Sequence, residues 1–161
     1  MRASSLSLRT VALAIACACF ALPVHAGPKA SAEKQELQRM YIDFLAQEGY
    51  RASTDDDGDV TFKKEGGNYF ISVMEDDKQF FRIVFPNFWT IESEQERTKV
   101  KIAADAANGS SKVVKIFTVR DDTWAAVEIF VADPADFKKV FTRAMSALDY
   151  GVQNFVGRMK E

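Results

Sequence analysis

The sequence predicts a single α+β domain with a mainly antiparallel sheet of about five to six strands and three helices. Three segments repeat apolar residues at helical spacing, and strand-length segments separated by short turns rich in Asp, Gly and Asn lie between them. The resulting element order is α-β-β-β-β-α-β-β-α. Because connections this short join neighbouring strands as hairpins, we expect an antiparallel sheet with helices packed on it.

Residues 1–26 show the order of features that is typical of a secretory signal peptide. Two arginines precede an apolar run over residues 10–22, and Val24 and Ala26 occupy the positions that signal peptidase recognises. We therefore expect export to the periplasm or the medium, with cleavage after Ala26.

Three alternatives remain for this N-terminal segment: a membrane anchor, a buried helix, or lipidation at Cys17 or Cys19. The apolar run has about 13 residues, whereas a helix that crosses a bilayer needs about 20. The residue three positions before each cysteine is alanine, and the apolar run continues past both. The signal peptide is therefore favoured, no integral membrane segment is expected after cleavage, and residues 27–32 are expected to form a flexible lead-in.

Removal of the signal peptide would leave 135 residues without cysteine or histidine, because Cys17, Cys19 and His25 all lie in the removed segment. This loss excludes Ser-His-Asp and Cys-His catalytic arrangements and the usual ligands of zinc, copper and haem. The mature net charge would be −4 with dispersed lysines, which argues against nucleic-acid binding. We expect no catalytic residues, no metal and no cofactor.

One domain is expected over residues 33–160, and its first helix should run from about Ala32 to Glu48. Ser31 is suited to the N-cap, and Gly49 should end the helix. Four strand-length segments follow, at residues 50–54, 59–64, 69–74 and 79–85. The fourth is apolar on both sides, which predicts a central strand with both faces covered, and Pro86 should stop it.

The acidic turn at residues 55–59 partly matches a calcium loop of the EF-hand type. Its last position would be Lys64, where that loop requires a bidentate glutamate. The Asp-Gly pair within the turn is instead typical of a tight hairpin. We interpret the segment as an acidic hairpin turn.

The second half of the chain predicts a helix, a hairpin and a long final helix. Ser93 and Glu96 form a capping box, which starts a helix that runs to about Ala107. A hairpin is expected from strands at residues 112–119 and 123–131. Asp133 and Pro134 then cap the third helix, which carries the strongest periodic pattern in the chain.

The third helix is too long for the predicted sheet. Residues 134–160 would span about 40 Å, whereas the strand at 79–85 would span about 23 Å. The helix could kink at Gly151 and fold onto the first helix, cross the sheet diagonally, or dock its end on a second copy or another protein. The residues of that end are Val152, Phe155, Val156 and Met159.

Phe88 and Trp89 follow Pro86 in a predicted connection between periodic elements. Such a pair can cover a sheet edge or plug the core, or it can be exposed as an aromatic anchor for a partner. Together with the end of the third helix, the two residues are candidates for partner binding.

Several local features resemble the YbjN-type domain, over about residues 33–160. They are the helix end Phe44-Leu-Ala-Gln-Glu-Gly-Tyr50, the acidic turn at 55–59, the strand entry Gly67-Asn-Tyr-Phe70, the hairpin with Lys115 and Asp121-Asp122, and the aspartate-capped last helix. The resemblance implies a fold similar to that of type III secretion chaperones, which bind partner chains and often dimerise. The family is described as bacterial sensory transduction regulators, and the resemblance implies no catalytic residues.

These observations favour an exported, non-enzymatic domain that binds another polypeptide or a second copy of itself, in a chaperone-like or regulatory role. The alternative is a periplasmic small-ligand carrier with an aromatic-lined pocket between the helices and the sheet. A hydrolase that uses carboxylates without a metal is the least favoured class. A deep apolar pocket would indicate the carrier, and a shallow apolar face would indicate the protein binder.

Overall fold

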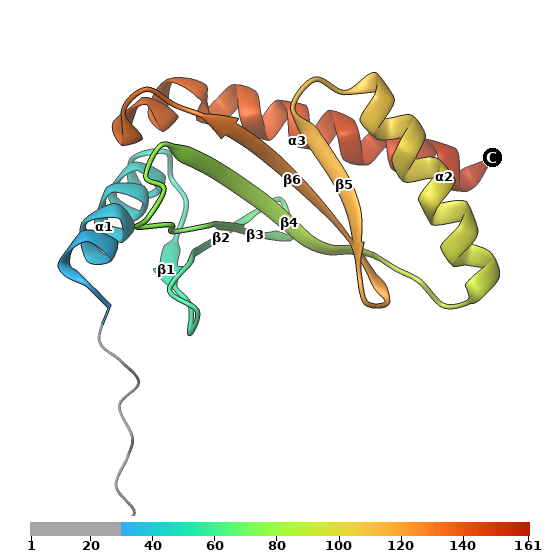
Figure 1. The fold of residues 1–161 in the computed structure, drawn as a ribbon, viewed down its shortest axis with the longest axis horizontal. Helices are drawn as coiled ribbons and strands as arrows, with labels where there is room; N and C mark the ends of the chain where they lie inside the picture. The colour runs from blue at the N-terminus through green and yellow to red at the C-terminus, as the bar shows by residue number, and fades with distance from the viewer. Residues whose placement is uncertain (1–29) are drawn as a thin grey trace, which may run out of the picture.

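A computed structural model describes residues 30–161, so the predicted signal peptide and most of the lead-in lie outside the described residues. The helices are α1 (Ala32–Gln47), α2 (Glu94–Ser110) and α3 (Phe137–Lys160), the last preceded by a short 3-10 helix, η1 (Pro134–Asp136). The strands are β1 (Ala52–Thr54), β2 (Val60–Lys64), β3 (Gly67–Ile71), β4 (Phe80–Thr90), β5 (Val114–Val119) and β6 (Asp122–Phe130). The α+β class and the element order predicted from the sequence are confirmed (Figure 1).

The strands form one sheet in the order β1-β2-β3-β4-β6-β5, and every neighbouring pair is antiparallel. β6 lies between β4 and β5, so β5 forms one edge and β1 the other. In the middle, Ile83 of β4 lies opposite Ile71 of β3 and Val127 of β6. The expectation that this segment is central in the sheet is confirmed.

The helices pack on one face of the sheet, which we call the covered face, and the opposite side is the open face. Figure 1 shows α3 running along the strands, with α1 near one end and α2 near the other. Side chains alternate between the two faces along each strand. Strand residues buried beneath the helices are Val60, Ile71, Ile83, Ala125 and Val127. No helix of residues 30–161 packs on the open face.

The amino end of the domain is held by a capped helix and an aromatic core. The Oγ of Ser31 accepts a hydrogen bond from the backbone N–H of Lys34 at 3.0 Å, as its predicted N-cap role requires. Phe44 of α1 meets Phe137 and Phe141 of α3 edge-on, with ring centroids 4.9 and 5.1 Å apart. These contacts pack α1 against the start of α3.

Pro86 does not stop β4, contrary to the prediction. The strand continues to Thr90, and its pairing with β6 shifts register between Phe85 and Trp89. Pro86 lies inside this irregular stretch, where a residue without a backbone N–H removes no regular ladder bond. The next residue, Asn87, has a φ of 51°, which turns the chain locally.

The prediction that both faces of β4 are covered is also wrong. Phe81 and Ile83 lie on the covered face, under the helices. Val84 points to the open face, and it is nevertheless fully buried. Its cross-strand neighbours there are Phe70 and Ala126. Neighbouring side chains of the sheet itself therefore bury Val84.

Helix α2 begins as predicted and ends later. The Oγ of Ser93 accepts from the N–H of Glu96 at 3.1 Å, which is the expected capping bond. The helix runs to Ser110, past the expected end at Ala107. The amide of Asn108 bonds both backbone groups of Ile116 on β5, at 2.7 and 3.0 Å. This side chain therefore blocks the centre of an edge strand from pairing with another chain.

Helix α3 runs without interruption through Gly151, so the predicted weak point does not break it. Gly151 is buried, and a Cβ at this position would lie 2.7 Å from Cγ1 of Val114. The glycine therefore allows α3 to approach β5 closely. The second half of α3 packs against α2, not against α1.

Candidate binding surface

An aromatic cluster lies on the open face, which carries no helix among the described residues. It consists of Phe70 on β3, Phe117 on β5 and Trp124 on β6, and we call it the open-face cluster. The ring of Trp124 lies 6.0 Å from that of Phe70 and 6.2 Å from that of Phe117. The indole N–H of Trp124 donates to Oδ1 of Asn87 at 2.8 Å, so its polar atom is satisfied and its ring is half-buried.

A row of charged residues crosses the open face beside this cluster. Glu128 lies at its centre and accepts from Nε of Arg82 and from Nζ of Lys115, each at 3.1 Å. Arg82 also reaches Oγ of Ser72 at 3.5 Å. Beyond the row, Phe80 and Phe130 pair at the far end of the strands, where Phe130 is 77% exposed.

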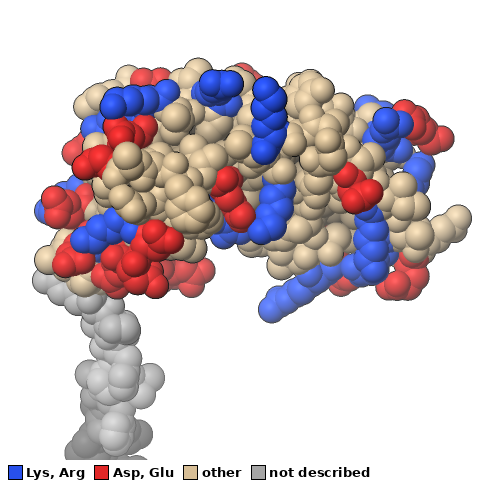
Figure 2. Space-filling model, turned by 45° about the horizontal axis from the view of Figure 1, so that its top comes forward, with Lys and Arg blue, Asp and Glu red and all other residues tan. Residues whose placement is uncertain are grey.

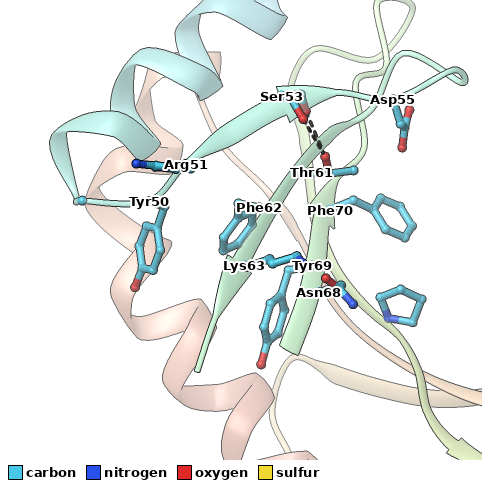
Figure 3. Close-up of a pocket in the computed structure, with 12 residues that line it drawn as sticks. Tyr50, Arg51, Ser53, Asp55, Thr61, Phe62, Lys63, Asn68, Tyr69 and Phe70 are labelled. Carbon is cyan, nitrogen blue, oxygen red and sulfur yellow. Dashed lines mark hydrogen bonds between the residues drawn. The ribbon is translucent and has the colours of Figure 1, made fainter. Parts of the chain in front are cut away.

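An open pocket of about 860 Å³ continues from the open-face cluster over β1, β2 and β3. Figure 3 shows Phe70 and Asn68 on one side of these strands, and Tyr50, Phe62 and Tyr69 pointing the other way, towards α3. The open-face residues that line the pocket are Arg51, Ser53, Asp55, Thr61, Lys63, Asn68, Phe70 and Pro86. Phe70 belongs to both features, so the pocket and the cluster form one continuous surface.

The acidic turn before β2 forms a hydrogen-bonded hairpin, as predicted. Oδ1 of Asp55 accepts from the backbone N–H groups of Asp57 and Asp59, at 3.1 and 2.9 Å. Asp59 in turn accepts from the N–H of Val73 at 2.9 Å. Burial raises the pKa of Asp59 above its ordinary value. Lys34 donates to the carbonyl of Asp57, so the turn is tied to α1.

The acidic side chains are concentrated at one end of the molecule, around the start of α1 (Figure 2). Lys78 pairs there with Glu33 at 2.8 Å, and this contact lowers the pKa of the Glu33 carboxyl. Within residues 30–161, no group of three or more metal-ligating side chains is close enough to hold an ion.

Phe88 and Trp89 pack against the interior of the domain. Both rings meet Phe155 edge-on, at 5.2 and 5.8 Å, and both side chains are half-buried. The indole N–H of Trp89 donates to Oε1 of Glu96 at 2.9 Å. The pair therefore joins β4 to the two C-terminal helices and fills the core, which is the first of the two alternatives, and it is not an exposed anchor.

The end of α3 is likewise part of the core. Phe155 is fully buried and Met159 is 7% exposed, while Val152 and Val156 are half-buried against the same cluster. Lys99 of α2 donates to the carbonyl of Met159 at 2.8 Å. The expectation of an association surface here is corrected, because α2 and the β4 bulge cover this stripe.

The sequence contains a signal for the open face that our predictions did not use. In β5, Lys115 and Phe117 alternate with the covered residues Val114 and Ile116. Trp124 similarly alternates with buried neighbours in β6. Apolar residues on both faces of several strands, with helices enough for one face, indicate an apolar surface that the helices leave open.

The fold and this surface define an α+β domain with an open, aromatic-rich sheet face. A scan against known protein families found no matching family model, and a search of curated proteins found no match either. Among residues 30–161, no helix is both long and apolar enough to span a membrane.

Proposed function

We propose that this protein is an exported, non-enzymatic domain that binds another polypeptide, and that the partner lies on the open face. The observation that carries the proposal is the open-face cluster of Phe70, Phe117 and Trp124, which no described helix covers. The exposed face of an antiparallel sheet is usually polar. Rigid aromatic side chains on such a face are the residues that most often anchor protein partners.

The resemblance to YbjN-type domains supports the same proposal. The order α-β-β-β-β-α-β-β-α, on which the resemblance rests, is the order of the fold. The proposed role is accordingly chaperone-like or regulatory. Export through the segment 1–26 belongs to the proposal, and N-terminal sequencing of the mature protein tests it, with Gly27 as the expected first residue.

A small-ligand carrier is the second candidate, and the pocket over β1–β3 favours it. Its volume of about 860 Å³ lies within the usual range for ligand sites, about 300–1,000 Å³. Aromatic residues line the pocket, as the carrier hypothesis expected, and they are Tyr50, Phe62, Tyr69 and Phe70. The pocket is nevertheless open and lies over the strands, whereas the carrier hypothesis placed a cavity between the helices and the sheet. Native mass spectrometry of the protein purified from its host distinguishes the two, because a carrier would retain a small molecule.

Partner capture with matched variants tests the protein-binding proposal. Phe117→Lys places a charge in the open-face cluster, and Ile102→Lys places the same charge on α2, where Ile102 is 67% exposed. We expect the Phe117 variant to lose the polypeptide that the wild-type protein captures, and the Ile102 variant to retain it. Far-UV circular dichroism and melting temperature verify that both variants fold.

Two results would contradict the proposal. One is capture that survives Phe117→Lys, and the other is capture that is lost equally in both variants. Light scattering on the same samples shows whether the partner is a second copy of the chain, since the Phe117 variant would then be a monomer.

A further inference from the structure

We infer that the pocket on the open face binds an acidic segment of the partner polypeptide, whose carboxylates pair with Arg51 and Lys63 while an apolar side chain packs against Phe70 and Pro86. This inference rests on the proposed function and names the chemistry of the partner. It depends on the charges of the open face, on the residues that line the pocket and on the directions in which the Arg51 and Lys63 side chains point.

The two cations of the pocket lack partners within the described residues. Arg51 and Lys63 are exposed, and neither forms an ion pair with any other residue of 30–161. The next residue, Lys64, points to the other side of β2 and pairs with Glu65 and Asp149, each at 3.2 Å. The two adjacent lysines therefore differ, because Lys64 forms ion pairs within the fold and Lys63 faces the pocket.

The charge of this surface is opposite to that of the domain. Residues 30–161 contain 18 basic and 23 acidic side chains, a net charge of −5. The open face and its pocket carry the cations Arg51, Lys63, Arg82 and Lys115 and the carboxylates Asp55, Asp122 and Glu128. An acidic segment would thus be attracted to this face and repelled by most of the remaining surface.

The carboxylate in the pocket lining does not cancel this attraction. Oδ1 of Asp55 already accepts two backbone N–H groups of its own turn. Those donors compensate its charge locally, and the turn holds the carboxylate at the rim of the strands. Arg51 and Lys63 have no comparable partner among the described residues.

The rest of the lining suits a peptide. The hydroxyl of Thr61 donates to the carbonyl of Ser53 at 3.1 Å and lies 3.3 Å from the Ser53 hydroxyl. Asn68 lies opposite Lys63 in the sheet, and its exposed amide offers a donor and an acceptor for a peptide backbone. Phe70 and Pro86 supply an apolar wall. An alkyl chain would require an enclosed apolar cavity, whereas this pocket is open and mixed in character.

Arg51 and Lys63 point in different directions in Figure 3. They therefore suit two separate carboxylates rather than one isolated anion. In an extended peptide, alternate side chains on one side are about 7 Å apart, so a segment with acidic residues at alternate positions can place two carboxylates along the pocket.

A peptide series tests this inference. The probe is a fluorescent decapeptide that alternates glutamate and phenylalanine, with matched versions in which glutamine or lysine replaces every glutamate. We expect the glutamate peptide to bind most tightly, with an affinity that falls as salt is added. Fluorescence anisotropy measures the three dissociation constants.

Charge reversal in the protein locates the site. The double variant Arg51→Glu with Lys63→Glu should weaken binding of the glutamate peptide by about tenfold or more, because charge-assisted hydrogen bonds contribute at least this much. The control is Lys101→Glu with Lys138→Glu, which makes the same change in net charge at exposed helix positions. The control should retain binding.

The inference is overturned if the glutamine or lysine peptide binds as well as the glutamate peptide. It is equally overturned if the glutamate peptide shows no binding up to about 1 mM, or if both double variants behave alike. Partner capture then separates the two proposals. If Phe117→Lys abolishes capture and the pocket double variant does not, the acidic-segment inference is wrong and the proposed function stands.

Discussion

The two faces of one sheet differ in what covers them, since the helices pack on one face and no helix of residues 30–161 packs on the other (Figure 1). On the covered face, Ile83 of β4 and Val127 of β6 are buried, and α3 packs against both strands. On the open face, Val84 is equally buried, but only by neighbours such as Phe70 within the sheet. Burial of a strand residue therefore does not reveal whether a helix covers it.

The two tryptophans express the same contrast. Each satisfies its indole N–H, Trp89 through Glu96 and Trp124 through Asn87. Trp89 then packs against Phe155 in the core, whereas Trp124 packs against Phe70 and Phe117 of the open-face cluster. The same residue type therefore fills the core on one face and forms a half-buried surface of the sheet on the other.

The largest expected difference between the faces is in the free energy of unfolding. Phe155→Ala should lower it by about 3–5 kcal/mol, because the ring is fully buried and its removal leaves a cavity. Phe117→Ala should lower it by about 1 kcal/mol or less, since that ring is already partly in water. Urea unfolding of the two variants measures both values. Equal losses would contradict the division into two faces.

Alkaline pH should destabilise the covered face through Tyr41. Burial raises the pKa of Tyr41 from its ordinary value of 10.0 to about 12. The unfolded chain therefore loses the phenolic proton at lower pH than the folded chain does. The stability contributed by the neutral phenol is complete below pH 10 and is lost as the pH rises through about 12, up to about 2 kcal/mol.

Melting curves between pH 8 and 12 check this expectation, with Tyr41→Phe as the control. The variant should lose less stability than the wild-type protein over the upper part of the range. Parallel curves for the two proteins would show that Tyr41 titrates in the folded state as it does in the unfolded state.

Substitution of two glycines of α3 should change the free energy of unfolding by smaller amounts and in opposite directions. Gly151→Ala should destabilise the domain by about 1–3 kcal/mol, because its Cβ would lie 2.7 Å from Val114. Gly157→Ala should stabilise it by about 0.5–1 kcal/mol, because that position is open and alanine favours a helix. Thermal unfolding of both variants decides the signs. A stabilising Gly151→Ala would contradict the close approach of α3 to β5.

Local signals predicted much of the fold. The caps at Ser31 and Ser93 lie where the sequence places them, and each accepts a backbone N–H. Asp133 also accepts a backbone N–H, but it caps the short 3-10 helix η1 that precedes α3, not α3 itself. Helix capping and hairpin turns depend on residues a few positions apart, so one segment contains the whole signal. The passage of β4 through Pro86 was missed because the register shift depends on pairing with the distant strand β6.

The candidate site was harder to predict for the same reason. An apolar stripe at the end of α3 shows that Phe155 must be covered, but not that Phe88, Trp89 and α2 cover it. The open-face cluster joins Phe70, Phe117 and Trp124 from three strands that the sheet order brings together. The order of the strands in the sheet determines which aromatic residues the helices leave uncovered. The periodicity of a single segment carries no information about that order.

The measurement that tests the central claim most directly uses the two tryptophans, which are the only ones in the sequence. Trp89→Phe leaves Trp124 as the reporter on the open face, and Trp124→Phe leaves Trp89 on the covered face. Acrylamide quenching is measured for each variant with and without the captured partner polypeptide. We expect the partner to protect Trp124 strongly and to leave the quenching of Trp89 unchanged. Protection of Trp89 with no change at Trp124 would contradict the assignment of partner binding to the open face.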